Sequence, residues 1–306
     1  MLHIGNAAGT LSWPQGTVNL RLDEIERLAQ SAATHITIGP LTMEARPGNI
    51  GETYYYHPAE RWSLNSKGLP SLGFKKFGPV IRRIADIAHK YGKKLRVTVA
   101  GFSPIEYAFL TAFAFANGAD EVEENFGCPN VWGEDGKQKP IPSYNPLLVG
   151  EILLFVGYML HSGQLVDVKI SPVPDTILNL LVPQFHMAGC VGNVVAVNTI
   201  PNEDRLREDG KHALNFNGGN HVGGLAGKPL KEEALRVVRS LRPMLSPSIG
   251  IIGVGGIFTG EDAFEFLEAG AAGLQIGTAF LENGPRIFSD VLEGLARIPK
   301  AEKHLV

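Results

Sequence analysis

The chain has 306 residues, 44% of them hydrophobic and 19% charged, and its net charge at pH 7 is −3. These values provide for a large apolar core and argue against nucleic acid or an anionic membrane as a partner. The two cysteines, Cys128 and Cys190, are too few for a disulfide framework, and neither lies near a second cysteine or a histidine pair at a metal-ligand spacing. We therefore expect a cytoplasmic protein without a metal site.

Short apolar runs alternate with helical patterns along the chain. Several of the runs are near-continuously apolar, which is typical of parallel strands buried on both faces. Between them, apolar residues recur at helical spacing, as in the stretches 22–31, 230–241 and 263–269. The expected strands cover residues 2–6, 35–38, 95–100, 121–126, 165–170, 194–198, 249–253 and 273–276.

Eight strand–helix units in a chain of this length predict a (β/α)8 TIM barrel. An open, doubly wound sheet is the alternative, and counting units does not separate the two. The stretches 39–76, 129–145 and 200–229 are long connections, and each follows an expected strand. In a barrel, these long loops would gather at the carboxyl ends of the strands, where active sites form. No linker interrupts the pattern, so we expect one domain over residues 1–306. The N-terminus lacks the pattern of a signal peptide.

Two of the last strands end in glycine. Gly255 and Gly256 follow one strand, and Gly277 and Thr278 follow the next. In barrels, the loops after strands seven and eight commonly bind phosphate through backbone N–H groups, which glycine leaves accessible. Tight turns are the alternative interpretation of either pair by itself. No G-x-G-x-x-G follows the first strand, so a dinucleotide fingerprint is absent from the sequence.

Polar side chains follow the central strands. Asn125, Cys128 and Asn130 fall just beyond the expected strand 121–126, and could bind a planar polar ring and remove a proton from it. A turn with a buried cysteine is the alternative. Lys169 lies late in an apolar strand, where a lysine either reaches solvent or faces a buried anion. Asn198 and Thr199 end the next strand, although asparagine also occurs routinely in turns.

The sequence 125–130, Asn-Phe-Gly-Cys-Pro-Asn, resembles the Asn-x-Ser-Cys-Pro-Asn motif of the class 1 dihydroorotate dehydrogenases. The likeness continues in family order over most of the chain and is most specific in the last third. It extends through residues 65–70, 168–172, 197–199, 223–229, 252–263 and 275–279.

This resemblance implies an FMN-dependent barrel enzyme that oxidises dihydroorotate to orotate in pyrimidine biosynthesis, with Cys128 as the base. Its partners would be a small-molecule substrate and a second copy of the chain, with no membrane. The electron acceptor would be fumarate, or NAD through an iron–sulfur subunit. The implied FMN contacts are Ala8, Asn125, Lys169, Val197, Gly227, Gly255, Gly256, Gly277 and Thr278. The implied substrate contacts are Asn65, Gly68, Leu69, Asn125, Asn130, Asn198 and Thr199.

The chain also departs from the family pattern. A lysine usually follows the second strand, but Ile38 and Gly39 stand there. Lys67 replaces a methionine of the family motif and could supply the missing cation to the substrate, or could face solvent. Gly127 replaces a serine, and the loop 133–142 is long and polar. These changes keep alternatives open: another dihydropyrimidine or an enone as substrate, a non-catalytic flavin-binding protein, or a flavin-free barrel lyase or isomerase.

Overall fold

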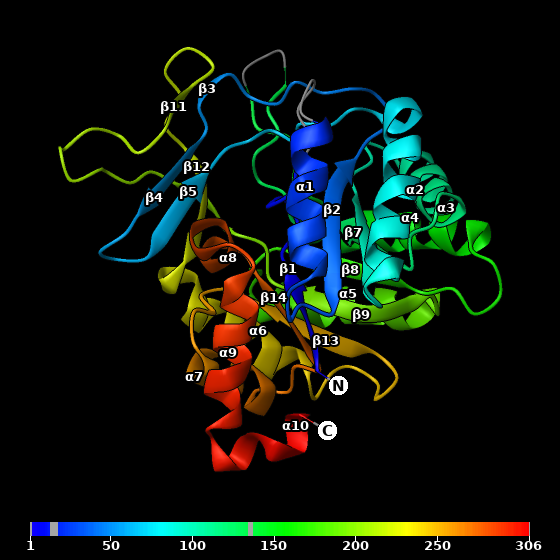
Figure 1. The fold of residues 1–306 in the computed structure, drawn as a ribbon. Coiled ribbons are helices and arrows are strands. Elements are labelled where there is room, and N and C mark those ends of the chain that lie inside the picture. Colours follow the sequence, from blue (N-terminus) through cyan, green and yellow to red (C-terminus); the bar gives the residue numbers. More distant parts are fainter. Residues whose placement is uncertain (1, 13–17, 134–136, 306) are drawn as a thin grey trace.

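Eight parallel strands form a closed barrel in the computed structural model, which describes residues 2–12, 18–133 and 137–305 (Figure 1). The strand order around the barrel is β1-β14-β13-β9-β8-β7-β6-β2, and β1 pairs with β2 to close it. The predicted TIM barrel is thus confirmed, and the open sheet is excluded. The barrel strands are β1 (His3–Asn6), β2 (His35–Leu41), β6 (Lys94–Val99), β7 (Glu121–Asn125), β8 (Val166–Ile170), β9 (Val191–Ala196), β13 (Gly250–Val254) and β14 (Gly273–Ile276).

The predicted strands all correspond to barrel strands, with shifted ends. The largest shift is in β9, which begins at Val191 and ends at Ala196, so that Asn198 and Thr199 lie beyond the strand. Backbone pairing sets this limit, because Val197 already donates its N–H to the carbonyl of Val254 outside the regular ladder. The two polar residues therefore lie just beyond the strand at the carboxyl edge of the sheet, where Asn198 donates its N–H to the carbonyl of Ile170 at 2.8 Å.

Helices surround the barrel and bury one apolar face each. The helix predicted at 263–269 begins earlier, because Thr259 and Asp262 form a reciprocal capping box at its start. Cys190 lies in the core between strands and helices, as expected. The α-helices are α1 (Val18–Ala29), α2 (Phe74–Lys90), α3 (Pro104–Ala116), α4 (Pro146–Met159), α5 (Asp175–Ala188), α6 (Lys231–Leu241), α7 (Gly260–Glu268), α8 (Thr278–Asn283), α9 (Arg286–Ala296) and α10 (Glu302–Leu305). Short 3-10 helices cover η1 (Pro142–Tyr144), η2 (Lys228–Leu230) and η3 (Pro299–Ala301).

Two of the long connections form a second sheet, which the sequence patterns did not predict. Its order is β10 (Ile200–Glu203), β12 (Gly223–Gly227), β5 (Trp62–Asn65) and β4 (Tyr54–His57). A further pair joins β3 (Gly51–Glu52) to β11 (Asn215–Phe216). These strands pair segments about 160 residues apart in the chain, and they enclose a small apolar cluster of their own. In Figure 1 this sheet stands beside the barrel, next to α8.

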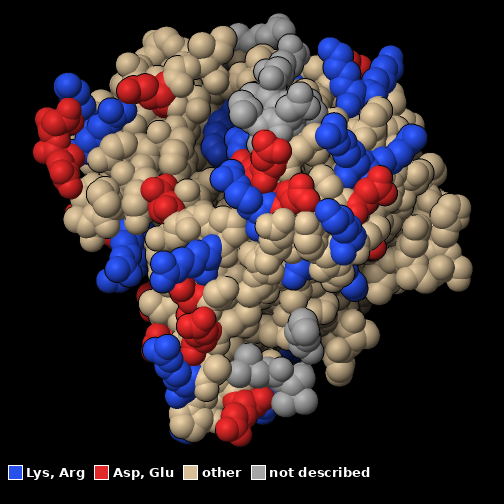
Figure 2. All heavy atoms as spheres, in the orientation of Figure 1, with Lys and Arg blue, Asp and Glu red and all other residues tan. Residues whose placement is uncertain are grey.

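The surface carries mixed charge. On the face in Figure 2, basic and acidic side chains are interspersed over the described residues, without one continuous basic band. Among the residues that the structure describes, there is no helix of the length and apolarity needed to cross a membrane.

Candidate active site

One cavity lies at the carboxyl ends of the barrel strands, between the barrel and the four-stranded sheet. Asn125 ends β7, Lys169 lies next to the end of β8, and Gly277 directly follows β14. The structure brings all of the predicted site residues to the lining of this cavity: Ala8, Asn65, Lys67, Gly68, Leu69, Asn125, Cys128, Asn130, Lys169, Val197, Asn198, Thr199, Gly227, Gly255, Gly256, Gly277 and Thr278. Their individual roles stay predictions.

Glycines shape one end of the cavity. A Cβ atom at Gly227, whose φ is 85°, would lie 2.3 Å from the carbonyl oxygen of Arg61. A Cβ at Gly256, with φ of 68°, would lie 2.7 Å from Cβ of Lys231. At Gly277 the nearest atom would be 3.6 Å away, so this glycine borders open space in the cavity. The bare backbone here leaves room for a bulky oxyanion.

Amides form another wall, and their orientations are fixed by hydrogen bonds. Asn198 donates from Nδ2 to Oδ1 of Asn125 at 3.2 Å. Asn130 donates from Nδ2 to Oδ1 of Asn65 at 2.9 Å, which links the cysteine loop to the end of β5. Asn65 in turn donates to the carbonyl of Gly224 at 3.2 Å. Together these side chains present donors and acceptors suited to a planar polar ring.

Cys128 is half-buried in the same cavity. Burial raises the pKa of its thiol to about 11, while the backbone N–H of Asn130 and the guanidinium of Arg46 oppose that rise. The pKa rises because desolvation of the thiolate outweighs its two stabilising neighbours.

The charge lining the cavity is positive. Among the described residues that line it, two are lysines and none is aspartate or glutamate. Lys169 donates to Oε1 of Gln275 at 3.2 Å and lies 3.9 Å from Oε1 of Glu123, below the cavity floor. Lys67 donates to the carbonyl of Gly9 at 3.2 Å, and burial lowers the pKa of its ammonium to about 8. The cavity therefore favours an anionic ligand.

Sequence reasoning missed several residues of this site. Tyr54 and Ser63 line the cavity from the unpredicted sheet, and Ser63 Oγ lies 2.8 Å from Oγ1 of Thr278. Thr98 reaches it from the end of β6. Glu123 is fully buried below the floor, and a glutamate in the middle of a barrel strand was the one available signal for it.

The long loop 133–142 is described only in part, since residues 134–136 lie outside the described residues. Beside that gap, Trp132 and Gln138 form an isolated antiparallel bridge. Gln138 donates from Nε2 to the carbonyl of Pro129, and Lys139 donates its N–H to the carbonyl of Val131 at 2.8 Å. These bonds tie the described part of the loop to the segment that follows Cys128.

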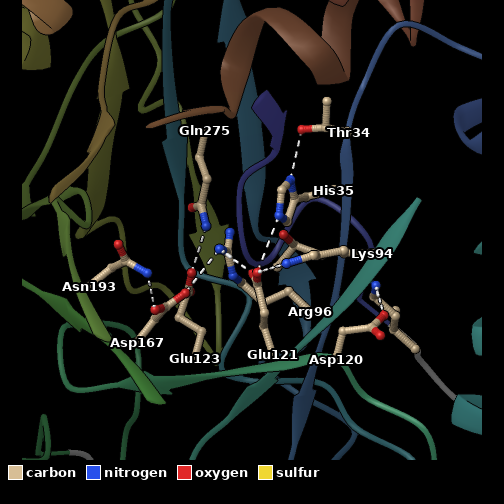
Figure 3. A network of polar contacts seen from close by, with 12 residues as sticks. Thr34, His35, Lys94, Arg96, Asp120, Glu121, Glu123, Asp167, Asn193 and Gln275 are labelled. Atoms are coloured by element: carbon tan, nitrogen blue, oxygen red, sulfur yellow. Dashed lines mark hydrogen bonds and ion pairs between the residues drawn. The ribbon is translucent and has the colours of Figure 1, made fainter. Parts of the chain in front are cut away.

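A second polar cluster lies inside the barrel at the opposite end (Figure 3). Glu121 accepts from Arg96 at 2.6 Å, and its other oxygen lies 3.3 Å from Nε2 of His35 and 3.6 Å from Nζ of Lys94. His3 is close enough to complete a set of three metal-ligating groups. Because both oxygens of Glu121 already contact cationic groups, ion pairing accounts for this cluster.

A closed parallel barrel with a cavity at the carboxyl ends of its strands, into which amides and lysines converge, is the arrangement of a (β/α)8-barrel enzyme. The family model described as dihydroorotate dehydrogenase matches residues 5–298. The putative dihydroorotate dehydrogenase A (fumarate) of Streptococcus uberis is 31% identical over 92% of this chain and 87% of its own length. Dihydroorotate dehydrogenase A (fumarate) of Lactococcus lactis subsp. lactis is 32% identical over 90% of this chain and 86% of its own.

The fold is also that of a solved relative. A crystal structure of DHODH from Eimeria tenella, in complex with ferulenol, has a TM-score of 0.77 over 96% of this chain and 80% of that chain, at 20% identity. From the sequence matches, the chain belongs to the dihydroorotate dehydrogenase family.

Proposed function

We propose that this protein is an FMN-dependent dihydroorotate dehydrogenase that oxidises dihydroorotate to orotate. The observation that supports this best is that Cys128, the amide wall, Lys169 and the glycines all line one cavity. A base, a set of ring-binding amides and a place for an oxyanion are what this oxidation and its cofactor require.

The cavity fits FMN on two counts: its glycine end and its lack of lining carboxylates among the described residues. Gly255, Gly256, Gly277 and Thr278 would hold the phosphate. Ala8, Asn125, Val197 and Gly227 would line the ring and ribityl chain, and Lys169 would face the pyrimidine edge of the ring. Bound FMN supplies the acceptor for a hydride taken from C6 of the substrate.

Cys128 would take the proton from C5 of dihydroorotate as the hydride leaves C6. Its raised pKa means that little thiolate exists at neutral pH in the structure described here. Arg46 is the nearby cation whose charge favours the thiolate. A shorter distance between Arg46 and Cys128 in the substrate complex would therefore increase the fraction of active base.

The substrate ring would lie against the amide wall. Asn65, Asn130 and Asn198 would bind its polar edges through side chains whose orientations are already fixed. This preorganisation lowers the cost of ordering them on binding. Gly68, Leu69, Asn125 and Thr199 would complete the pocket from the adjacent segments.

An anaerobic visible spectrum tests the function. Addition of dihydroorotate to the purified protein should bleach its flavin absorbance, and fumarate is the first acceptor to try for reoxidation. A yellow protein that stays oxidised with dihydroorotate would reject this substrate. Screening other dihydropyrimidines and enones would then separate a different substrate from a non-catalytic flavin-binding protein. A protein that is colourless and binds no added FMN would favour the flavin-free alternative.

The assembly is also a proposal. By family resemblance we propose a homodimer, and an iron–sulfur subunit only if NAD proves to be the acceptor. Sedimentation of the purified protein over a hundredfold range of concentration tests the first part, because a stable dimer keeps one sedimentation coefficient over that range. A species with the mass of one chain at all concentrations would contradict it.

A further inference from the structure

The barrel interior below the cavity holds a group of buried charges. Glu123 and Asp167 contribute two buried carboxylates and Glu121 a partly buried one, while Arg96 and Lys169 contribute two buried cations. Figure 3 shows several of these side chains pointing toward one another from neighbouring barrel strands. Charges this deeply buried are costly unless each has a partner. How they are partnered therefore decides which of them stay ionised.

Glu123 and Gln275 form a closed triangle with Lys169. Gln275 donates from Nε2 to Oε2 of Glu123 at 2.6 Å, and its Oε1 accepts from Lys169 at 3.2 Å. Lys169 lies 3.9 Å from Oε1 of Glu123, which also accepts from Thr98 at 3.4 Å. A carboxylate can only accept hydrogen bonds, so Glu123 fixes which way the Gln275 amide faces. The amide oxygen is thereby aimed at the lysine.

The position of Lys169 makes its charge sensitive to that triangle. The side chain is almost completely buried, although Lys169 also lines the cavity. Burial lowers the pKa of the ammonium and Arg96 lowers it further, whereas Glu123 raises it. Glu123 is thus the group inside the barrel that opposes loss of the proton. Across the cavity, Lys67 and Cys128 are the other titratable groups that line it with Lys169, apart from Tyr54.

We infer that Glu123, acting with Gln275, is a positioning residue that holds Lys169 in place as an ammonium facing the flavin site. The inference rests on the proposed FMN binding. The consequence is electrostatic, because a fixed cation beside the ring would favour reduced FMN, which carries additional negative charge, over oxidised FMN. Glu123 does not line the cavity, so it acts through Lys169 rather than by touching the ligand.

The neighbouring residue offers a matched control. Glu124 is also a fully buried glutamate of β7, but it is hydrogen bonded to Thr111 of α3 on the helix side of the strand. Glu123→Gln and Glu124→Gln therefore make the same chemical change at adjacent positions of one strand. Only the first removes the carboxylate next to Lys169.

The test measures the reduction potential of bound FMN between pH 6 and 9, together with its dissociation constant, in the purified full chain. Glu123→Gln should weaken binding of reduced FMN relative to oxidised FMN about tenfold, equivalent to a potential about 30 mV more negative. The difference in potential between Glu123→Gln and wild type should grow with pH, because Lys169 loses its proton at a lower pH in the variant. Glu124→Gln should leave the potential unchanged. Gln275→Met, a milder change should Glu123→Gln fold poorly, should shift the potential in the same direction.

Lys169→Met separates positioning from a merely structural role. This variant should lower the potential below that of wild type, by an amount that shrinks as the pH rises and wild-type Lys169 itself loses its proton. Adding Glu123→Gln to Lys169→Met should cause no further shift. Equal shifts from Glu123→Gln with and without Lys169, or no shift from either Glu123→Gln or Gln275→Met, would overturn the inference while FMN binding stands. A wild-type protein that binds no FMN would overturn the proposed function, and this inference with it.

Discussion

The ammonium of Lys67 lies 3.2 Å from the carbonyl oxygen of Gly9, where the segment after β5 meets the segment after β1. It also lies 5.4 Å from the centre of the Tyr54 ring. Both contacts are with uncharged groups, so neither of them neutralises the charge that Lys67 contributes to the cavity. Lys169 differs, because Glu123 lies beneath it.

Lys67→Met should weaken binding of orotate by about ten- to a hundredfold, because a charge-assisted hydrogen bond contributes about 1.5–3 kcal/mol. Binding of uncharged uracil should change little. In the wild type, Lys67 is charged below its pKa of about 8, so orotate affinity should fall as the pH rises through that value. Titration of the flavin spectrum measures both ligands. Lys76→Met, at an exposed lysine of α2, is the control, and equal losses for orotate and uracil would contradict the prediction.

Cys128→Ala should slow flavin reduction by dihydroorotate about 10²- to 10⁴-fold, the usual contribution of a general base. FMN should remain bound. In the wild type, the reduction rate should rise with pH toward the thiol pKa of about 11, since only the thiolate accepts a proton. Anaerobic stopped-flow absorbance gives both results. Cys190→Ala changes the other cysteine, which is in the core, and should leave the reaction rate unaltered. A rate that is independent of pH would argue against Cys128 as the base.

Gly277→Ala should reduce FMN affinity while the fold survives. The added Cβ would meet Ala7 at 3.6 Å, an ordinary contact, but it would project into the space where the phosphate is proposed to bind. Fluorescence titration of apoprotein with FMN measures the loss, and thermal unfolding of the apoprotein verifies the fold. Gly157→Ala, within α4, is the matched control because its Cβ would find its nearest neighbour 3.8 Å away, outside the cavity. Unchanged FMN affinity in Gly277→Ala would place the phosphate elsewhere.

Glu124→Gln should stabilise the protein at alkaline pH. Burial raises the pKa of Glu124 to about 8 in the folded state, above its ordinary value of 4.5. The free energy of unfolding therefore falls as the pH rises from 4.5 to about 8, by about 1.4 kcal/mol for each pH unit between the two pKa values. Glutamine removes this loss, because it cannot ionise and keeps a donor toward Thr111. The variant should unfold at a higher temperature than wild type at pH 8–9, and at the same temperature below pH 4.5. An increase of the same size at both pH values would contradict the raised pKa of Glu124.

Thr111 supports a protonated Glu124. Its hydroxyl lies 2.8 Å from the carbonyl of Tyr107 and 2.6 Å from Oε1 of Glu124. A hydroxyl has one proton to donate, so the two short contacts are both satisfied if the carboxyl group supplies the second proton. Glutamine can make the same pair of hydrogen bonds through its amide group.

Much of the fold could be predicted from local pattern. Several barrel strands, such as β13, are near-continuous apolar runs because both of their faces are covered, and such runs are visible in the sequence. The four-stranded sheet was missed because β5 and β12 are short and each lies in a loop rich in turn residues. Their pairing joins Asn65 to Gly224, and no local signal in either segment indicates the other.

The sequence by itself determined the strand–helix units, the glycines at the last two strands and the residues that follow the strands, because backbone propensity and burial act over a few neighbouring positions. Closure of the eight strands into a barrel is seen in the tertiary structure. Only the tertiary structure decided the charge states. The pKa of Cys128 rises, and Lys169 lies beside Glu123 while Lys67 contacts the carbonyl of Gly9, because desolvation and pairing depend on side chains brought together from distant strands.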